Sequence, residues 1–170
     1  MSTLAPDEKT TLVMAYTRDA LYRGEVVTKE NVRVSIWLRT EAAPRYIHLL
    51  KAQVITFGGA VKTVNYSEVY IPTTTVLAFH IAPPGHEALD YDENEKNRAM
   101  EPTTVGVGTF LFKGKLRVSA QSGLGVTLEL AKIPWMSLYE TEITNLNLPQ
   151  MPPLGVPMLL LNPAQVSFAK

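Results

Sequence analysis

Two stretches of this chain match each other: Leu21-Tyr22-Arg23-Gly24-Glu25-Val26 and, ninety positions later, Leu111-Phe112-Lys113-Gly114-Lys115-Leu116. Three more blocks match in the same order at nearly the same offset. They are 34–38 with 124–128, IHLLKAQV (47–54) with MSLYETEI (136–143), and IPTTTV (71–76) with LNPAQV (161–166). Four blocks in one order at one offset predict an internal duplication, and therefore a fold that is built twice.

Apolar residues recur at every second position within these blocks, which is the period of a β-strand. The alternation over 32–38 predicts a half-buried strand. Gly24 and Gly114 interrupt strand patterns, which predicts a bulge or tight bend in each copy. We predict no amphipathic helix longer than about ten residues. Further strands are predicted over 10–16, 46–57, 69–81, 135–148 and 158–168.

Two units of roughly seventy residues with four or five bent strands each predict an all-β fold made of two tandem small β-barrels. Closing a barrel removes the exposed strand edges of an open sheet. Tandem copies often recreate a two-fold dimer, so the barrels are expected to be related by a pseudo-twofold axis. The alternative is one continuous β-sandwich with strands shared between the halves. The predicted boundaries are 1–81 for the first repeat, 82–102 for a Pro-bounded linker and 103–170 for the second repeat.

Composition narrows the classes of protein further. The chain has 170 residues, 46% of them hydrophobic, and its 16 Lys and Arg balance 16 Asp and Glu. It has no cysteine, which excludes a disulfide scaffold and a thiol nucleophile. The linker is acidic, with six acids against two bases, whereas each repeat carries a small positive charge. Without an apolar run of about eighteen residues or a recognisable export signal, we expect a cytoplasmic protein that does not span a membrane.

Residues that could carry catalysis are sparse. His80 and His86 precede the acids of the linker, but their spacing matches no recognised ligand motif, so no metal or cofactor is expected. The nearest approach to a nucleophile elbow is SGLG at 122–125, which we interpret as a hairpin turn before a strand. A base for it would have to come from His48 or His80 across the interface between the repeats. We therefore expect no catalytic residues. A hydrolase with its site between the two repeats remains a remote alternative.

The main alternative function is binding of single-stranded nucleic acid. Such binding requires basic side chains for the backbone and aromatic rings on which bases stack. Both repeats place such side chains along their predicted strands, although the net charge of each repeat is small. The candidate contacts are Arg23, Arg33, Trp37, Arg39, Arg45, Lys113, Lys115 and Trp135.

A stiff apolar loop over 147–157 is the most unusual segment of the chain. Prolines alternate there with large apolar residues, so the segment would lose little entropy on docking to a partner. Packed back, it would instead cover an open barrel end or the other repeat. The candidate partner-binding residues are Leu148, Pro149, Met151, Pro152, Pro153 and Leu154.

The stretches LYRGEV (21–26), VRVSIWL (32–38) and LNPAQV (161–166) resemble a small uncharacterised bacterial β-domain family and, more distantly, the Sm-like and SH3-like barrels. The resemblance implies small barrels that assemble through strand edges. It implies RNA binding less directly, because the Asp and Asn of the Sm uridine-binding loops and the closing Arg-Gly are missing. We expect a non-catalytic binding or assembly module that binds a protein partner or a second copy of itself.

Overall fold

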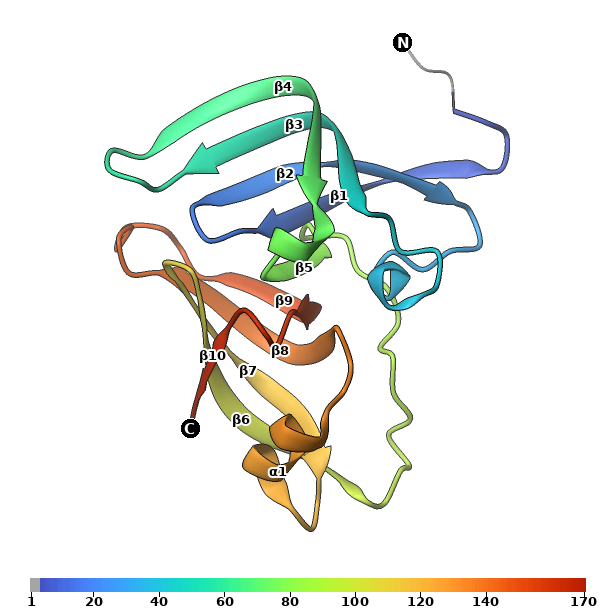
Figure 1. The fold of residues 1–170 in the computed structure, drawn as a ribbon, viewed down its shortest axis with the longest axis vertical. Helices are drawn as coiled ribbons and strands as arrows, with labels where there is room; N and C mark the ends of the chain where they lie inside the picture. Colours follow the sequence, from blue (N-terminus) through green and yellow to red (C-terminus); the bar gives the residue numbers. More distant parts are fainter. Residues whose placement is uncertain (1–3) are drawn as a thin grey trace.

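Ten strands form one antiparallel sheet in the computed structural model of the chain, which describes residues 4–170 (Figure 1). A short α-helix and two 3₁₀ turns (η1 and η2) connect some of the strands. In chain order the elements are β1 (Glu8–Tyr16), β2 (Ala20–Lys29), η1 (Trp37–Arg39), β3 (Tyr46–Thr56), β4 (Lys62–Pro72), η2 (Thr73–Thr75), β5 (Ala78–Ile81), β6 (Arg98–Val107), β7 (Phe110–Ser119), α1 (Gly123–Leu130), β8 (Met136–Asn145), β9 (Leu154–Leu161) and β10 (Ser167–Ala169). The all-β prediction is confirmed.

The sheet does not close, so the prediction of two small β-barrels is wrong. The strand order is β10-β6-β7-β8-β9-β5-β1-β2-β3-β4. Closure of the first half would require β4 to pair with β5. Instead β5 pairs with β9 of the second half, Ala78 opposite Leu161 and Phe79 opposite Leu160. The predicted alternative, a β-sandwich, is not formed either, because all ten strands belong to one sheet.

The pairing between the halves also overturns the predicted pseudo-twofold axis. A two-fold axis would bring the same strand of each half together, β5 with β10 or β4 with β9. The fifth strand of one half, β5, meets the fourth strand of the other, β9. This contact is head-to-tail, and among residues 4–170 it leaves β4 and β10 as the two open edges of the sheet.

The two halves share several features of local geometry. Each half has its fifth strand beside its first, followed by the second, third and fourth. The register shifts at Gly24 between β2 and β3, and at Gly114 between β7 and β8, as the predicted bulges required. The third strand of each half has one residue with positive φ, Lys51 at 49° and Glu140 at 47°.

The segment 32–38, which we predicted as a strand, is a turn that leads into η1. Val34 and Leu38, four residues apart, are buried in the first half. The carboxylate of Glu87 accepts hydrogen bonds from the backbone N–H groups of Val34 and Ser35, each at 3.0 Å. A strand would need such amides for its ladder, so the linker carboxylate stabilises the turn instead.

The matching segment of the second half forms α1 rather than the expected turn and strand. Leu124 and Leu128 lie on one face of this eight-residue helix and pack against the sheet. A spacing of four residues brings side chains to the same helical face, whereas we had counted the intervening Val126 as part of a period of two. Val126 is exposed. Neither α1 nor any other helix within 4–170 is long and apolar enough to cross a membrane.

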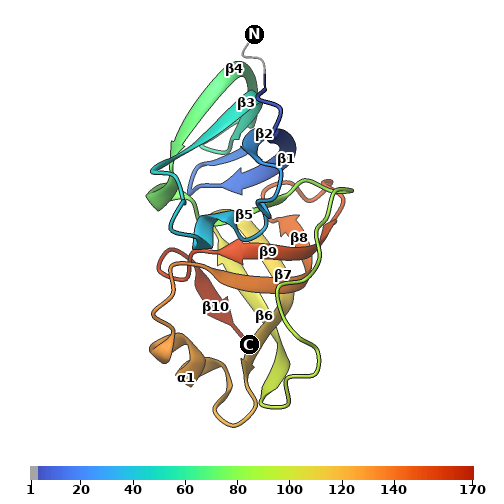
Figure 2. The ribbon, with the colours of Figure 1, turned by 90° about the vertical axis from the view of Figure 1, so that its right-hand side faces the viewer.

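Two hydrophobic clusters lie along the sheet, and each contains residues from both halves. The second-half cluster is built mainly by β6–β9, and Tyr16 and Leu77 of the first half pack into it. The first-half cluster is built mainly by β1–β5, and Trp135 and Leu160 of the second half pack into it. Figure 2 shows β5 and β9 near the middle of the molecule, where these exchanges occur. The halves therefore stabilise each other through buried apolar contacts.

Candidate functional site

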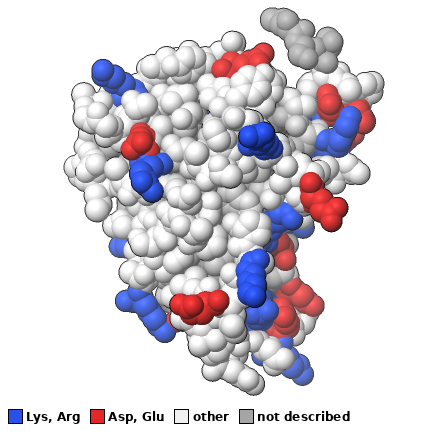
Figure 3. Space-filling model, in the orientation of Figure 1, with Lys and Arg blue, Asp and Glu red and all other residues white. Residues whose placement is uncertain are grey.

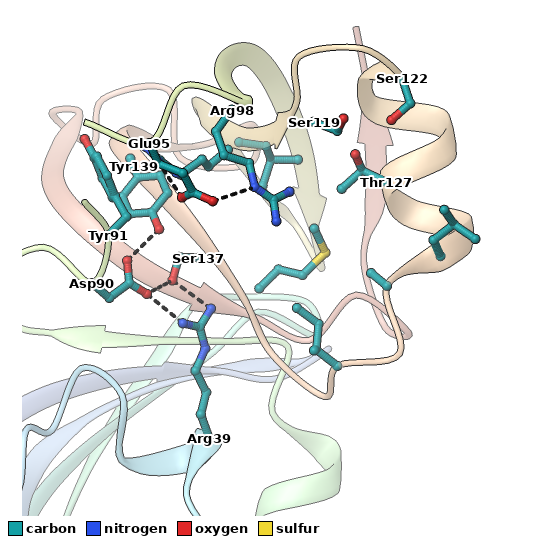
Figure 4. A pocket seen from close by; sticks show the side chains of 16 residues that line it. Arg39, Asp90, Tyr91, Glu95, Arg98, Ser119, Ser122, Thr127, Ser137 and Tyr139 are labelled. Carbon is teal, nitrogen blue, oxygen red and sulfur yellow. Dashed lines mark hydrogen bonds and ion pairs between the residues drawn. The ribbon is translucent and has the colours of Figure 1, made fainter. Parts of the chain in front are cut away.

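The acidic linker binds both halves through Asp90. Arg39 from the η1 turn donates to Asp90 Oδ2 at 2.6 Å, and Ser137 Oγ donates to the same oxygen at 2.6 Å. Tyr139 donates its hydroxyl to Oδ1 at 2.5 Å (Figure 4). The Asp90 side chain is only 7% exposed. Because Arg39 belongs to the first half and Ser137 to β8, this carboxylate connects three parts of the chain.

The charge of Asp90 is well compensated in this position. Burial alone would raise the pKa of its carboxyl group, but hydrogen bonds from Ser137 and Tyr139 and the adjacent Arg39 guanidinium hold the pKa below the usual value. Burial and the bond to the carboxylate also raise the pKa of Tyr139. All three partners stabilise the ionised carboxylate, which indicates a structural ion pair rather than a proton donor.

A second linker acid, Glu95, neutralises two further arginines. Glu95 accepts from Arg117 on β7 at 2.8 Å and lies 3.5 Å from Arg98 Nε. Arg33 donates to the carbonyl of Ala88. The face drawn in Figure 3 accordingly shows basic and acidic side chains next to one another, without a large area of one sign. Asp90 and Glu95 of the linker are thus neutralised within the molecule. Residues 98–102, which we had assigned to the linker, are the start of β6.

The structure disperses the candidate nucleic-acid contacts. Arg23 lies on β2 and Lys113 on β7, and four strands separate these two in the sheet. Arg45 is exposed, whereas Lys115 pairs with Glu140. The two tryptophans face the interior: Trp37 is half-buried against the first-half cluster and Trp135 is 5% exposed within it. The buried ring of Trp135 offers no free face for a base, so binding through these residues stays a prediction supported by the exposed cations and the partly exposed ring of Trp37.

A pocket of about 480 Å³ opens between α1 and the end of the linker (Figure 4). Its floor is apolar, with Leu116 and Met136, and hydroxyl groups of Ser122 and Thr127 line the helix side. The catalytic groups that we considered do not meet in it. His80 is buried against Tyr16, and His48 binds Glu68 at 3.1 Å. Within 4–170, no group of three or more His, Cys, Asp or Glu residues is placed to hold a metal ion.

The Pro-rich segment that we predicted as a loop over 147–157 is a loop only up to 153, because Leu154 begins β9. Met151 and Leu154 are half-buried and pack against the second-half cluster, and Leu148 is half-buried too. Pro149, Pro152 and Pro153 are exposed. The loop thus packs back through its large apolar side chains while its prolines face outward, and its role in partner binding stays a prediction.

The edge strand β4 was only partly recognised in the sequence, because the strand predicted over 69–81 overlaps β4 at 69–72 alone. It is eleven residues long, and within the described chain no strand covers its outer edge. Its sequence contains only two charged residues, Lys62 and Glu68. Five of the eleven exposed large hydrophobic residues lie on or beside it: Tyr46, Val61, Val64, Tyr66 and Tyr70. The alternation of Val64, Tyr66, Glu68 and Tyr70 after the FGGAVK turn was the available signal.

Long exposed edge strands with few charges are uncommon in proteins that stay monomeric, because unpaired N–H and C=O groups invite another strand. Tyr70 is 58% exposed and stacks on His48 with the ring centroids 4.3 Å apart. Glu68 accepts from both of these residues, and their hydrogen bonds lower the pKa of its carboxyl group. Beside this cluster, a hollow of about 390 Å³ is lined by Tyr22, Tyr70 and Ile71. The edge of β4 and this hollow are the candidate binding site.

The chain matches no protein-family model, no curated protein and no solved structure.

Proposed function

We propose that this protein is a non-catalytic assembly module that binds another β-strand along the free edge of β4. The observation that carries the proposal is the length and apolar character of that edge. Pairing there would satisfy the outward N–H and C=O groups of β4, and main-chain hydrogen bonds would provide much of the affinity. The exposed side chains of Val64, Tyr66 and Tyr70 would be partly removed from water at the same time.

The shared geometry of the halves supports a tandem duplication as the origin of this module. Both halves have the same strand order, both have the bulge at the aligned glycines Gly24 and Gly114, and both have a positive φ at Lys51 and Glu140. A duplicated unit that already joins its copy through a strand edge is well suited to join further strands in the same way.

Size-exclusion chromatography with light scattering tests the proposal over a series of protein concentrations. The chain has a mass of 18.8 kDa, and we expect a larger species that grows with concentration. Lysine on an edge strand opposes strand addition, so a Tyr66→Lys/Tyr70→Lys variant should remain monomeric. The matched control, Val126→Lys/Leu130→Lys, changes two exposed apolar residues on α1 and should assemble like the unchanged protein.

A monomer at every concentration, without a bound strand from a co-purified protein, would contradict the proposal. Absorbance at 260 and 280 nm, recorded in the same run, separates the nucleic-acid alternative. Nucleic acid that co-elutes and is released by salt would replace strand addition as the leading function.

A further inference from the structure

The pairing of β5 with β9, which joins the two halves and is called the junction below, shows how the edge of a fourth strand such as β4 can be covered. β5 is paired on one side with β1 of its own half, where Ala78 lies opposite Tyr16. Its other side pairs with β9, the fourth strand of the second half. In the sheet order, β4 is the fourth strand of the first half, and β10 is the fifth strand of the second half. The two open edges are therefore the two partners of this junction, one from each half.

We infer that β10 of a second copy of this chain pairs antiparallel with β4 and repeats the β5–β9 junction between molecules. The inference rests on the proposed function and names its partner. Figure 1 shows β4 along the top of the molecule and β10 at the lower left, so one molecule presents the two complementary edges at separate places. A head-to-tail contact of this kind builds a closed ring or an open filament, depending on the rotation between neighbours.

The register of the new junction follows from the register inside the chain. Ser167 lies opposite Gly106 as Ala78 lies opposite Tyr16, so Ser167 and Phe168 occupy the places of Ala78 and Phe79. On the other side, β4 pairs with β3 as β9 pairs with β8, which sets Ile71 and Tyr70 in the places of Leu161 and Leu160. Phe168 of one copy therefore faces Tyr70 of the next, and Ser167 faces Ile71.

Side-chain chemistry fits this register. Phe168 and Tyr70 form an aromatic cross-strand pair, which is among the more stabilising kinds. Two residues beyond Phe168, the register places Lys170, which pairs with Glu101 in its own molecule, opposite Glu68 of the next copy, a pair of opposite charges. One departure weakens the contact: Asn162 donates its N–H to the Leu77 carbonyl at 2.8 Å inside the chain, and Pro72, which takes its place, has no N–H. The junction between copies is thus weaker than the junction within one.

The hollow beside Tyr70 and Ile71 gives independent support. In the second half, the matching place beside Phe112 and Leu161 is filled by Leu77 and Ala78, which precede and begin β5. In the first half, the corresponding place beside Tyr22 and Ile71 is the hollow of about 390 Å³. Ser167, which begins β10 and is exposed, is the residue that would enter it from a second copy, while Val166 packs against the second-half cluster of its own molecule.

Disulfide trapping tests this register directly, because the chain has no cysteine of its own. Tyr70→Cys and Phe168→Cys are made as separate variants, mixed in equal amounts at high concentration and oxidised. We expect a covalent dimer band about ten times stronger than either variant gives alone, because facing residues of paired strands meet the geometry of a disulfide. Phe168 is half-buried, so a second pair that spares it, Val69→Cys with Ala169→Cys, repeats the test one step along the same register.

A mismatched pair, Val64→Cys with Phe168→Cys, is the control and should give no more dimer than either variant alone, since six residues along a strand span about 20 Å. Equal dimer from the mismatched and matched pairs would overturn the register. A dimer formed by Tyr70→Cys alone would show β4 against β4, which overturns the inference and leaves strand addition at β4 intact. If neither matched pair crosslinks although the protein assembles in a β4-dependent manner, the partner strand is not β10. A protein that stays monomeric refutes the proposed function as well.

Discussion

Phe79 of β5 lies opposite Leu160 of β9, and this pair joins the two halves of the sheet. Phe79 is fully buried and Leu160 is 1% exposed, both in the first-half cluster. The contact explains why neither half closes into a barrel: the edge that would close each half is already occupied by the other half. It also defines the kind of contact that the outer edges, β4 and β10, remain free to make.

Truncation at this pair should destabilise the whole sheet. We expect Phe79→Ala to lower the free energy of unfolding by about 3–5 kcal/mol, because it opens a cavity in a buried cluster shared by both halves. Tyr70→Ala, at an exposed position, should change it by less than about 0.5 kcal/mol in the monomer. Urea unfolding followed by circular dichroism measures both. If Phe79→Ala lowers the free energy of unfolding by less than about 1 kcal/mol, the Phe79–Leu160 pair does not stabilise both halves as we propose.

The glycine at the second bulge should resist substitution. A Cβ at Gly114 would lie 2.9 Å from the Tyr139 carbonyl oxygen and 2.8 Å from Leu138 Cγ. We expect Gly114→Ala to cost about 1–3 kcal/mol, since the backbone must move to relieve the contact. Gly155→Ala on β9 is the matched control, because nothing lies within 4 Å of the added carbon and the alanine should be neutral or slightly stabilising. Thermal unfolding of both variants checks the difference, and equal midpoints would refute it.

Stability should fall in mild acid because of His80. Its ring is buried, its Nδ1–H donates to the Ile81 carbonyl, and Tyr16 donates its hydroxyl to Nε2 at 3.0 Å. Burial lowers the pKa of His80 to about 4, from 6.5 in the unfolded chain. The unfolded state therefore binds the proton first. The contribution of neutral His80 to the free energy of unfolding is therefore complete above pH 6.5 and declines toward pH 4, with a total loss of about 3 kcal/mol.

Other groups also titrate in this range, so the His80 contribution must be isolated. The double variant Tyr16→Phe/His80→Leu replaces both hydrogen-bonding partners by apolar side chains. Its free energy of unfolding should depend less on pH between 6.5 and 4 than that of the unchanged protein. Identical pH dependence for the two proteins would show that His80 is not held neutral by the fold.

Asp90 should matter more than any other acid of the linker. Asp90→Ala leaves Arg39, Ser137 and Tyr139 without their shared acceptor in a largely buried position, which should cost about 2–4 kcal/mol. Glu93→Ala removes the same charge at an exposed position of the same linker and should change stability by less than about 0.5 kcal/mol. Denaturation of both variants at two salt concentrations compares them. A similar, salt-dependent effect for both would reduce the role of Asp90 to general linker charge.

Much of the architecture is readable from periodicity, and the errors have physical causes. The strands around Gly24 and Gly114 and the all-β class follow from alternation and aligned glycines. The prediction of a strand over 32–38 was wrong because the alternation is a local pattern. In the structure, the carboxylate of Glu87, about fifty residues further along the chain, accepts hydrogen bonds from two backbone amides of this segment. The prediction of closed barrels was wrong because a strand pattern does not specify which strand edges pair. The β5–β9 pairing that prevents closure joins segments that are far apart in the sequence.

The candidate site was harder to predict than the fold. Some of the basic and aromatic residues that we selected are exposed. Trp135, however, is buried in the hydrophobic core, and Arg39 is paired with the linker carboxylate of Asp90. The spacing of residues in the sequence predicts neither contact. The edge of β4 becomes a site only through its place at the end of the sheet order. Its apolar alternation is visible in the sequence, but a buried strand would look the same.

Hydrogen exchange of the unchanged protein at low and high concentration tests assembly through β4 most directly. Peptides from β4 and β10 should exchange more slowly at high concentration, and by similar amounts, because the outward amides of both strands become paired together. Peptides from β1 and β7, which are paired on both sides within one molecule, should not change. Exchange in β4 that is equally fast at both concentrations, in a sample that light scattering shows to be assembled, would contradict strand addition at this edge.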